Sequence, residues 1–184
     1  MNPSIEVPRV HPHARARRAC LAVAALLSWV ALAGPAAAVS VGEVLPARWL
    51  DSAAGPQPLI AGQARLTYVD FWASWCGPCK QSFPWMNEMH AKLAASGLRV
   101  LAVNVDARRA DAEQFLARNP ASFAIVFDRE GAFAKAVDVK TMPTSMLLDA
   151  EGKVLFVHHG FNARDREPLE AAINAALRGT KGLP

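Results

Sequence analysis

Two cysteines, Cys76 and Cys79, are separated only by Gly77 and Pro78, and this CxxC spacing can support thiol–disulfide exchange. The pair follows the apolar run 65–72 and begins a stretch in which apolar residues recur every three or four positions. We therefore expect the dithiol where a strand meets a helix N-terminus, because free N–H groups and the helix dipole favour a thiolate there. Cys76 is then the attacking nucleophile, and Cys79, one turn further in, resolves the mixed disulfide.

A structural disulfide and a structural zinc site are the alternatives for the same cysteine pair. Closing so short a loop stabilises a fold by only roughly 2 kcal/mol. Zinc needs four ligands, but the sequence has no second CxxC, and the adjacent His158 and His159 would point to opposite faces of a strand. Redox activity is therefore the preferred interpretation, with no metal and no bound cofactor expected.

Asp70 lies six residues before Cys76, inside the apolar strand and between Val69 and Phe71. Burial beneath a dithiol would raise the pKa of such a carboxyl group, which would let it accept the proton of Cys79 when that thiol attacks. The alternative is an ordinary strand-end carboxylate in contact with water. We predict that Asp70 is the proton acceptor.

The order of the remaining elements predicts the fold class. Strands are expected at 65–72, 99–106, 123–127, 145–149 and 154–159, helices at 79–96, 110–119, 130–137 and 164–178, and a small hairpin from 44–50 and 57–60. This alternation, followed by a terminal hairpin, predicts an α/β fold with a mixed, mostly parallel central sheet flanked by helices in one domain.

Residues 1–38 have the three parts of a secretory signal: an arginine-rich start, the apolar run 19–33, and small residues up to Ala38. Cleavage after Ala38 would leave 39–184 as a single domain of 146 residues. The apolar run is shorter than the roughly 20 residues that span a bilayer, although the segment would be an uncleaved membrane anchor if its helix continued to Val39. The export signal predicts that the protein is periplasmic, and disulfides persist in that compartment.

Composition excludes several classes of protein. The chain is 52% apolar and 20% charged, which excludes a disordered protein. Most of the net charge of +4 comes from residues 1–38, where four arginines are offset by one glutamate. Because the remainder has no basic patch with interleaved aromatic residues, nucleic acid is not an expected partner.

The segment 68–80, YVDFWASWCGPCK, is almost a standard thioredoxin active-site segment. From about Val44 to Leu177 the chain resembles the exported TlpA/ResA/CcmG-type branch of the thioredoxin superfamily. Pro84, the insertion 111–127 and the sequence MPTSMLLD–EGKV fit that branch. The resemblance implies a thioredoxin fold with an N-terminal β extension and a TlpA-type α/β insertion.

The same resemblance implies further site residues. It makes 141–144 a cis-proline loop, with Pro143 against the disulfide Cys76–Cys79 and Met142 offering its backbone to a substrate chain. A trans proline that opens the strand is the alternative. The residues expected to contact substrate are Trp75, Gly77, Pro78, Met142 and Pro143.

Two positions depart from the family pattern. Ala102 stands where thioredoxins place a lysine near the buried aspartate. Ala107 falls where several TlpA/ResA-type proteins have a functional glutamate, with Asp106 beside it. Partner specificity, such as recognition of apocytochrome c in cytochrome c maturation, is therefore not carried over to this chain.

These features predict a periplasmic thiol–disulfide oxidoreductase that acts on protein disulfides or thiols and receives electrons from a membrane thiol donor. The Gly-Pro pair resembles that of reducing thioredoxins and favours a reductase over an oxidase. One alternative is a peroxiredoxin-type thiol peroxidase, but a peroxidase of that type requires a threonine at the position of Ala73. The other alternative is a non-catalytic substrate-binding or metal-delivery module. Copper delivery requires a CxxxC motif, whereas this chain has CxxC.

Overall fold

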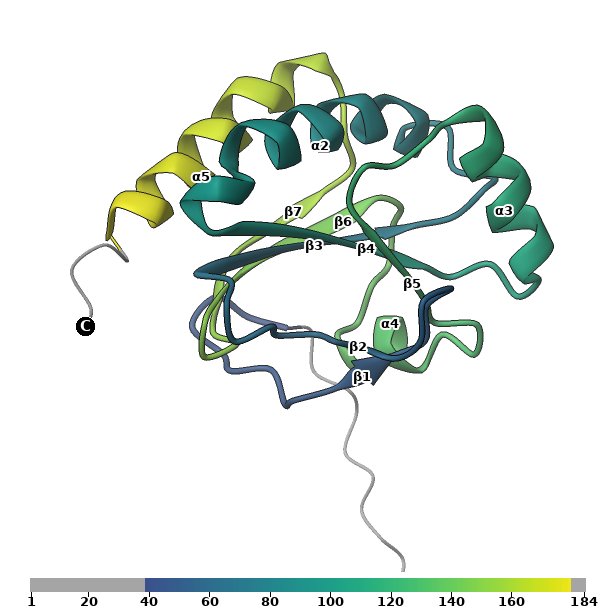
Figure 1. Cartoon of the computed structure of the whole chain (residues 1–184), viewed down its shortest axis with the longest axis horizontal. Coiled ribbons are helices and arrows are strands. Elements are labelled where there is room, and N and C mark those ends of the chain that lie inside the picture. Colours follow the sequence, from purple (N-terminus) through teal and green to yellow (C-terminus); the bar gives the residue numbers. More distant parts are fainter. Residues whose placement is uncertain (1–38, 180–184) are drawn as a thin grey trace, which may run out of the picture. The chain divides into compact units, whose positions relative to one another are not determined.

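A five-stranded sheet with the strand order β5-β4-β3-β6-β7 organises residues 39–179, the part of the chain that the computed structural model describes (Figure 1). Its strands are β3 (Leu66–Trp72), β4 (Leu98–Asn104), β5 (Ala124–Phe127), β6 (Thr144–Asp149) and β7 (Val154–His159). Neighbours β3, β4 and β5 are parallel, whereas β6 is antiparallel to both β3 and β7. Only β6 is therefore reversed, which confirms the mixed, mostly parallel sheet.

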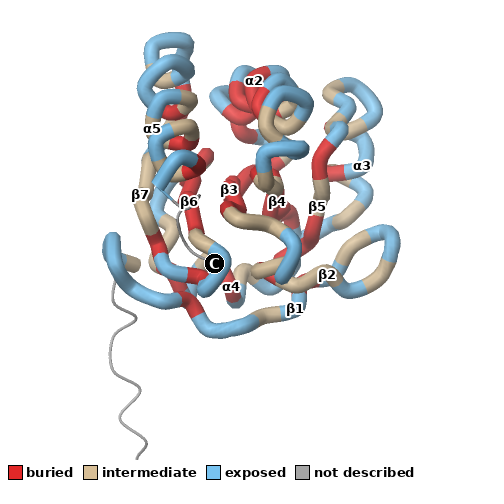
Figure 2. The backbone as a smooth tube through the Cα atoms, turned by 60° about the vertical axis from the view of Figure 1, so that its left-hand side comes forward, coloured by how far each residue is buried: buried red, intermediate tan, exposed pale blue. Residues whose placement is uncertain are grey.

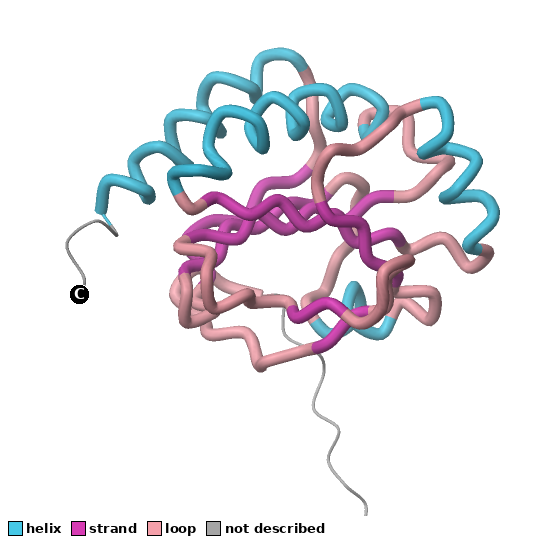
Figure 3. The backbone as a smooth tube through the Cα atoms, viewed as in Figure 1, coloured by secondary structure: helices cyan, strands magenta, loops and turns pink. Residues whose placement is uncertain are grey.

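Helices cover both faces of this sheet (Figure 3). The helical elements are α2 (Cys79–Leu93), η1 (Ala94–Ser96), α3 (Arg109–Arg118), α4 (Ala132–Ala136), η2 (Ala163–Asp165) and α5 (Arg166–Gly179). Helices α2, α3 and α5 pack on one face, and α4 lies on the other face with the antiparallel pair β1 (Trp49–Leu50) and β2 (Gln57–Pro58). The β1–β2 pair and the α3–β5 segment are the predicted extension and insertion.

The central strand β3 is buried along its whole length, between two apolar layers (Figure 2). Successive side chains of a strand point to opposite faces. Tyr68 and Trp72 therefore join the core under α2, α3 and α5, and Val69 and Phe71 join the core on the α4 side. The same alternation puts Asp70 on the α2 face, beneath the start of that helix.

Among the predicted boundaries that differ from the structure, two have clear local reasons. The N-terminal hairpin is shorter than expected, because Val44 forms a bridge with Lys153 at the β6–β7 turn instead of extending β1. Helix α4 begins later than predicted, because Gly131 precedes it with a left-handed φ of 65°. The Asp128 carboxylate then accepts hydrogen bonds from the first N–H groups of α4.

Candidate active site

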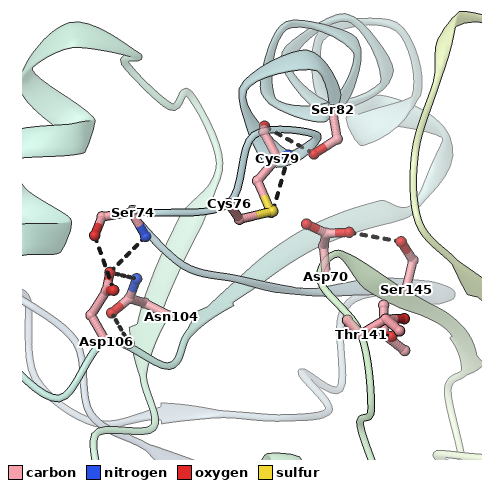
Figure 4. Close-up of a disulfide and its surroundings, with 10 residues drawn as sticks. Asp70, Ser74, Cys76, Cys79, Ser82, Asn104, Asp106, Thr141 and Ser145 are labelled. Carbon is pink, nitrogen blue, oxygen red and sulfur yellow. Dashed lines mark hydrogen bonds between the residues drawn. A yellow bond between two sulfur atoms is a disulfide. The ribbon is translucent and has the colours of Figure 1, made fainter.

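Cys76 lies on the loop that joins β3 to α2, next to the carboxyl end of the central strand, and Cys79 is the first residue of α2 (Figure 4). Trp72, the last residue of β3, is completely buried. Its ring packs against Phe83 of α2 and Phe115 of α3, with centroids 4.9 and 4.8 Å away. The chain then turns, and the Cys76 N–H donates to the Ala73 carbonyl over 3.1 Å. Aromatic packing thus holds the base of the loop that presents the sulfurs.

Cys76 and Cys79 form a disulfide, with their Cα atoms 5.3 Å apart. Helix α2 begins at Cys79, as predicted, so Cys76 lies just before the helix. The helix still reaches it, since the Cys79 N–H donates to Cys76 Sγ over 3.2 Å. A hydrogen-bond donor and the positive end of a helix dipole both favour negative charge on that sulfur.

The two cysteines have different access to a partner. Cys79 is completely buried and Cys76 is 3% exposed, whereas the adjacent Trp75 is 71% exposed. Gly77 and Pro78 are also exposed. Cys76 is therefore at the edge of an accessible rim, and Cys79 lies behind it.

Asp70 is buried on the sheet beneath the disulfide, as predicted, and is 1% exposed (Figure 4). Its Oδ1 accepts a hydrogen bond from the Ser145 hydroxyl of β6 over 2.7 Å. Burial raises the pKa of Asp70 to about 7, and the Ser145 hydrogen bond opposes this rise without cancelling it. Opposite Asp70 on β4 is Ala102, so the lysine of thioredoxins is absent from this position.

The peptide bond between Met142 and Pro143 is cis, as the resemblance implied. Pro143 is buried, and its carbonyl accepts the Gly160 N–H over 2.7 Å. The Thr144 hydroxyl donates to the Thr141 carbonyl over 2.8 Å and closes the loop on itself. The half-buried Met142 lies at the centre of this fixed loop, just before β6.

Asp106 holds the active-site loop from the neighbouring strand end (Figure 4). Its carboxylate accepts the Ser74 N–H over 2.9 Å, the Ser74 hydroxyl over 3.0 Å, and the Asn104 side-chain amide over 2.8 Å. Asp106 is 4% exposed, so these donors meet a buried carboxylate. Asp106 thus points at the turn that carries Cys76, whereas Ala107, at the family's glutamate position, has no side chain able to do this.

Ser74 and Ser145 have roles in this site that the sequence pattern did not reveal. The sequence indicates these two serines only by their positions: Ser74 is two residues before Cys76, and Ser145 is two residues after Pro143. Both become informative only once β4 and β6 are known to flank β3.

Two of the histidines that the structure describes make contacts of their own. In the part of the chain that the structure describes, no three His, Cys, Asp or Glu side chains cluster as metal ligands. His159 contacts the Thr144 hydroxyl, whereas His158 lies near Asp165. Within the same residues, no helix is both long enough and apolar enough to cross a membrane.

Fold and site together define the class: the protein is a thiol–disulfide oxidoreductase built on the thioredoxin fold. Within that class, residues 41–173 match the Redoxin family, and the chain belongs to it. It is a ResA- and CcmG-like member of the thioredoxin superfamily, as predicted.

Individual relatives agree with this assignment. The thiol-disulfide oxidoreductase ResA of Geobacillus thermodenitrificans is 34% identical over 118 residues, which cover 64% of this chain and 68% of the relative. ResA of Bacillus subtilis is 33% identical over 93 residues, or 50% of this chain and 52% of the relative.

Solved structures show the same fold. A candidate thiol:disulfide interchange protein DsbE from Chlorobium tepidum is 48% identical, with a TM-score of 0.73 over 76% of this chain and 99% of that chain. StoA from Bacillus subtilis is 24% identical, with a TM-score of 0.60 over 70% of this chain and 96% of that chain. The StoA likeness concerns the fold alone.

Proposed function

We propose that the protein reduces disulfides of other proteins in the periplasm, with Cys76 as nucleophile and Cys79 as resolving thiol. The observation that carries the proposal is the environment of the Cys76 sulfur. It accepts the first N–H of α2 over 3.2 Å and lies beside the exposed Trp75. An ionised sulfur at an accessible rim is what attack on a protein disulfide requires.

The reaction takes two exchange steps. The Cys76 thiolate attacks one sulfur of the substrate disulfide, and the other substrate sulfur leaves as a thiolate that takes a proton from solvent. Cys79 then gives its proton to Asp70 and attacks Cys76 Sγ, which closes the Cys76–Cys79 disulfide and releases the second substrate sulfur as a thiolate that takes a proton from solvent. With a pKa of about 7, Asp70 can accept that proton near neutral pH.

Substrate contacts are proposed for the rim and the cis-proline loop. Trp75, Gly77 and Pro78 are exposed around the sulfurs, and the Met142 backbone can pair with an extended substrate segment. Bonds to Gly160 and within the loop hold Pro143 and its neighbours in place before substrate arrives. Binding would therefore require little ordering of this surface.

Each catalytic cycle takes two electrons from the protein, and these must be returned. A Gly-Pro dipeptide between the cysteines resembles that of thioredoxin, whose potential is about −270 mV, which supports net reduction of substrates. We therefore propose that a thiol donor in the membrane reduces the Cys76–Cys79 disulfide after each cycle. Residues 1–38, which lie outside the described residues, would direct export or anchor the protein in the membrane.

The test is covalent trapping, with insulin as the probe. Reduced Cys79→Ser should accumulate an insulin-chain adduct at Cys76, seen by intact mass and removed by dithiothreitol, because the resolving sulfur is absent. Cys76→Ser is the matched control and should form no adduct, because Cys79 is completely buried. Equal adducts in the two variants, or no insulin reduction by the folded wild-type protein, would contradict the proposal.

A further inference from the structure

A row of polar side chains crosses the sheet from Asp70 towards the surface, within the otherwise apolar layer beneath α2 and α5. Ser145 of β6 is the register partner of Asp70, and His158 of β7 is the register partner of Ser145. Register partners on neighbouring strands point to the same face of a sheet. The three side chains therefore line up across β3, β6 and β7.

The contacts along this row lead from a buried group to partly exposed ones. The Ser145 hydroxyl donates to Asp70 Oδ1 over 2.7 Å (Figure 4). Cβ atoms of an antiparallel pair such as Ser145 and His158 lie about 5 Å apart, a gap that side-chain rotation or one water molecule spans. His158 Nε2 is 3.6 Å from Oδ2 of Asp165 in η2, and these two side chains are 29% and 21% exposed.

Among the described residues, Asp70 Oδ2 and Tyr68 Oη are buried without a hydrogen-bond partner, and the buried His158 Nε2 has only the Asp165 carboxylate nearby, at 3.6 Å. Buried polar atoms in native proteins are nearly always paired, and internal water serves where no protein group is available. A cluster of three such atoms in an apolar layer indicates a place where a hydrogen-bonded chain can form.

Tyr68 lies within this cluster, two residues before Asp70 on the same face of β3. Burial, and next the negative charge of Asp70, raise the pKa of Tyr68 well above its usual value; the neighbouring Ser145 hydroxyl opposes this rise, and the charge of Asp165 adds to it. Tyr68 therefore lies near both ends of the row and keeps a neutral hydroxyl, which can both donate and accept a hydrogen bond.

We propose that Ser145 and His158, with the Tyr68 hydroxyl beside them, carry the proton between Asp70 and solvent. This rests on the proposed role of Asp70 as acceptor of the Cys79 proton. The Asp70 O–H bond breaks towards Ser145 Oγ as the Ser145 proton passes to the His158 imidazole, directly or through one water molecule. The imidazolium, beside Asp165, then loses a proton to solvent. One proton moves, no electron does, and the reverse sequence reprotonates Asp70.

Within residues 39–179, the groups that face Asp70 from the other packed elements offer no comparable acceptor. Ala102 is its partner on β4, and Cys79 of α2 is bonded to Cys76 in the oxidised protein. The charged or titratable groups along the row are thus Tyr68 on β3, His158 on β7 and Asp165 on η2. Ser145 and His158 act through Asp70, so they are positioning and relay residues rather than catalytic ones.

The test measures proton exchange at Asp70 directly. In the oxidised protein labelled with ¹³C at aspartate carboxyl groups, NMR relaxation dispersion near the midpoint of the Asp70 titration gives the exchange rate between its protonated and ionised forms. His158→Gln and Ser145→Ala should each slow this exchange by roughly tenfold or more. His90→Gln, which removes another half-buried imidazole, is the matched control and should leave the exchange unchanged.

A conservative variant and a chemical rescue distinguish loss of the proton relay from a disturbed fold. Ser145→Thr keeps the hydroxyl and should keep fast exchange, and added imidazole should restore exchange in His158→Ala. An exchange rate in His158→Gln equal to that in His90→Gln, at an unchanged Asp70 pKa, would overturn the proposal. The role of Asp70 is tested separately: if Asp70→Asn resolves the mixed disulfide as fast as the wild type, the proposed proton acceptor is wrong, whatever the exchange rates show.

Discussion

At the scale of single residues, the ionisation of Asp70 depends on two opposing effects: the hydrogen bond from Ser145 and the removal of the carboxyl group from water. A hydrogen bond to a charged group is worth about 1.5 to 3 kcal/mol, and the Ser145 hydroxyl supplies one that favours the carboxylate. Removal from water favours the neutral acid, and it prevails, because the pKa rises from 3.8 to about 7. The carboxyl group therefore changes its charge near neutral pH, as a proton acceptor should.

This shift predicts how the stability of the oxidised protein depends on pH. Native Asp70 holds its proton more tightly than the unfolded chain does, so its stabilising effect is complete below pH 3.8 and is lost as the pH rises to about 7. Asp70→Asn does not ionise, so its stability relative to wild type should increase over that range, by roughly 4 kcal/mol in all. Urea unfolding at pH 4, 6 and 8 measures the difference.

The control for this experiment is Asp111→Asn. Asp111 pairs with Arg108 at the protein surface, so its substitution should give no comparable gain in stability as the pH rises. Parallel stability curves for wild type and Asp70→Asn from pH 4 to 8 would show that the Asp70 pKa is not raised.

At the scale of elements, the active-site loop depends on the end of the strand beside it. Trp72 and Asn104 are register partners at the ends of β3 and β4, so the residues that follow both strands lie next to each other. Asp106 uses this proximity to bind the backbone and hydroxyl of Ser74. The turn that carries Cys76 is therefore fixed from β4 as well as by its own chain.

Removing this connection should destabilise the protein and loosen the loop. Asp106→Ala leaves buried donors of Ser74 and Asn104 without an acceptor, which should cost about 2 to 4 kcal/mol, whereas Ser74→Ala should cost about 1 kcal/mol. The reaction of Cys76 with iodoacetamide in the reduced protein should also change in rate, because the sulfur is held less firmly against α2. Urea unfolding and alkylation kinetics measure both effects. Stabilities within 0.5 kcal/mol of wild type, roughly the scatter of surface substitutions, would show that Asp106 does not hold the loop.

Local pattern predicted most elements, because apolar periodicity reports which face of a segment is buried. It placed β3 and β7 within one residue and predicted the burial of Asp70 from its neighbours Val69 and Phe71. It could not predict the partners of Ser74 and Ser145, since these depend on which strands lie side by side and in which register. It placed the start of α2 at Cys79, as observed, but extended the helix to residue 96, where the structure has the separate 3-10 helix η1.

At the scale of the whole molecule, the proposed chemistry depends on the compartment in which the protein works. The thiol-reducing cytosol and the oxidising periplasm would give the Cys76–Cys79 pair different partners. Residues 1–38 carry most of the net positive charge, and the rest of the chain has 16 basic and 15 acidic side chains. This distribution fits the proposed export signal ahead of a nearly neutral domain, and we expect the export machinery to recognise residues 1–38.

Export should remove this leader from the protein. Small side chains at Ala36 and Ala38 fit the signal peptidase pattern, so expression of the full chain in a Gram-negative host should yield a periplasmic species that begins at Val39, identified by intact mass. Replacing Ala36 and Ala38 with phenylalanine blocks that pattern, and this variant should keep its full mass and remain with the membrane. Wild-type protein of full mass in the membrane fraction would show instead that the segment is a permanent anchor. Full mass in the cytosolic fraction would contradict export, and the reductant-rich cytosol would then have to supply the electrons.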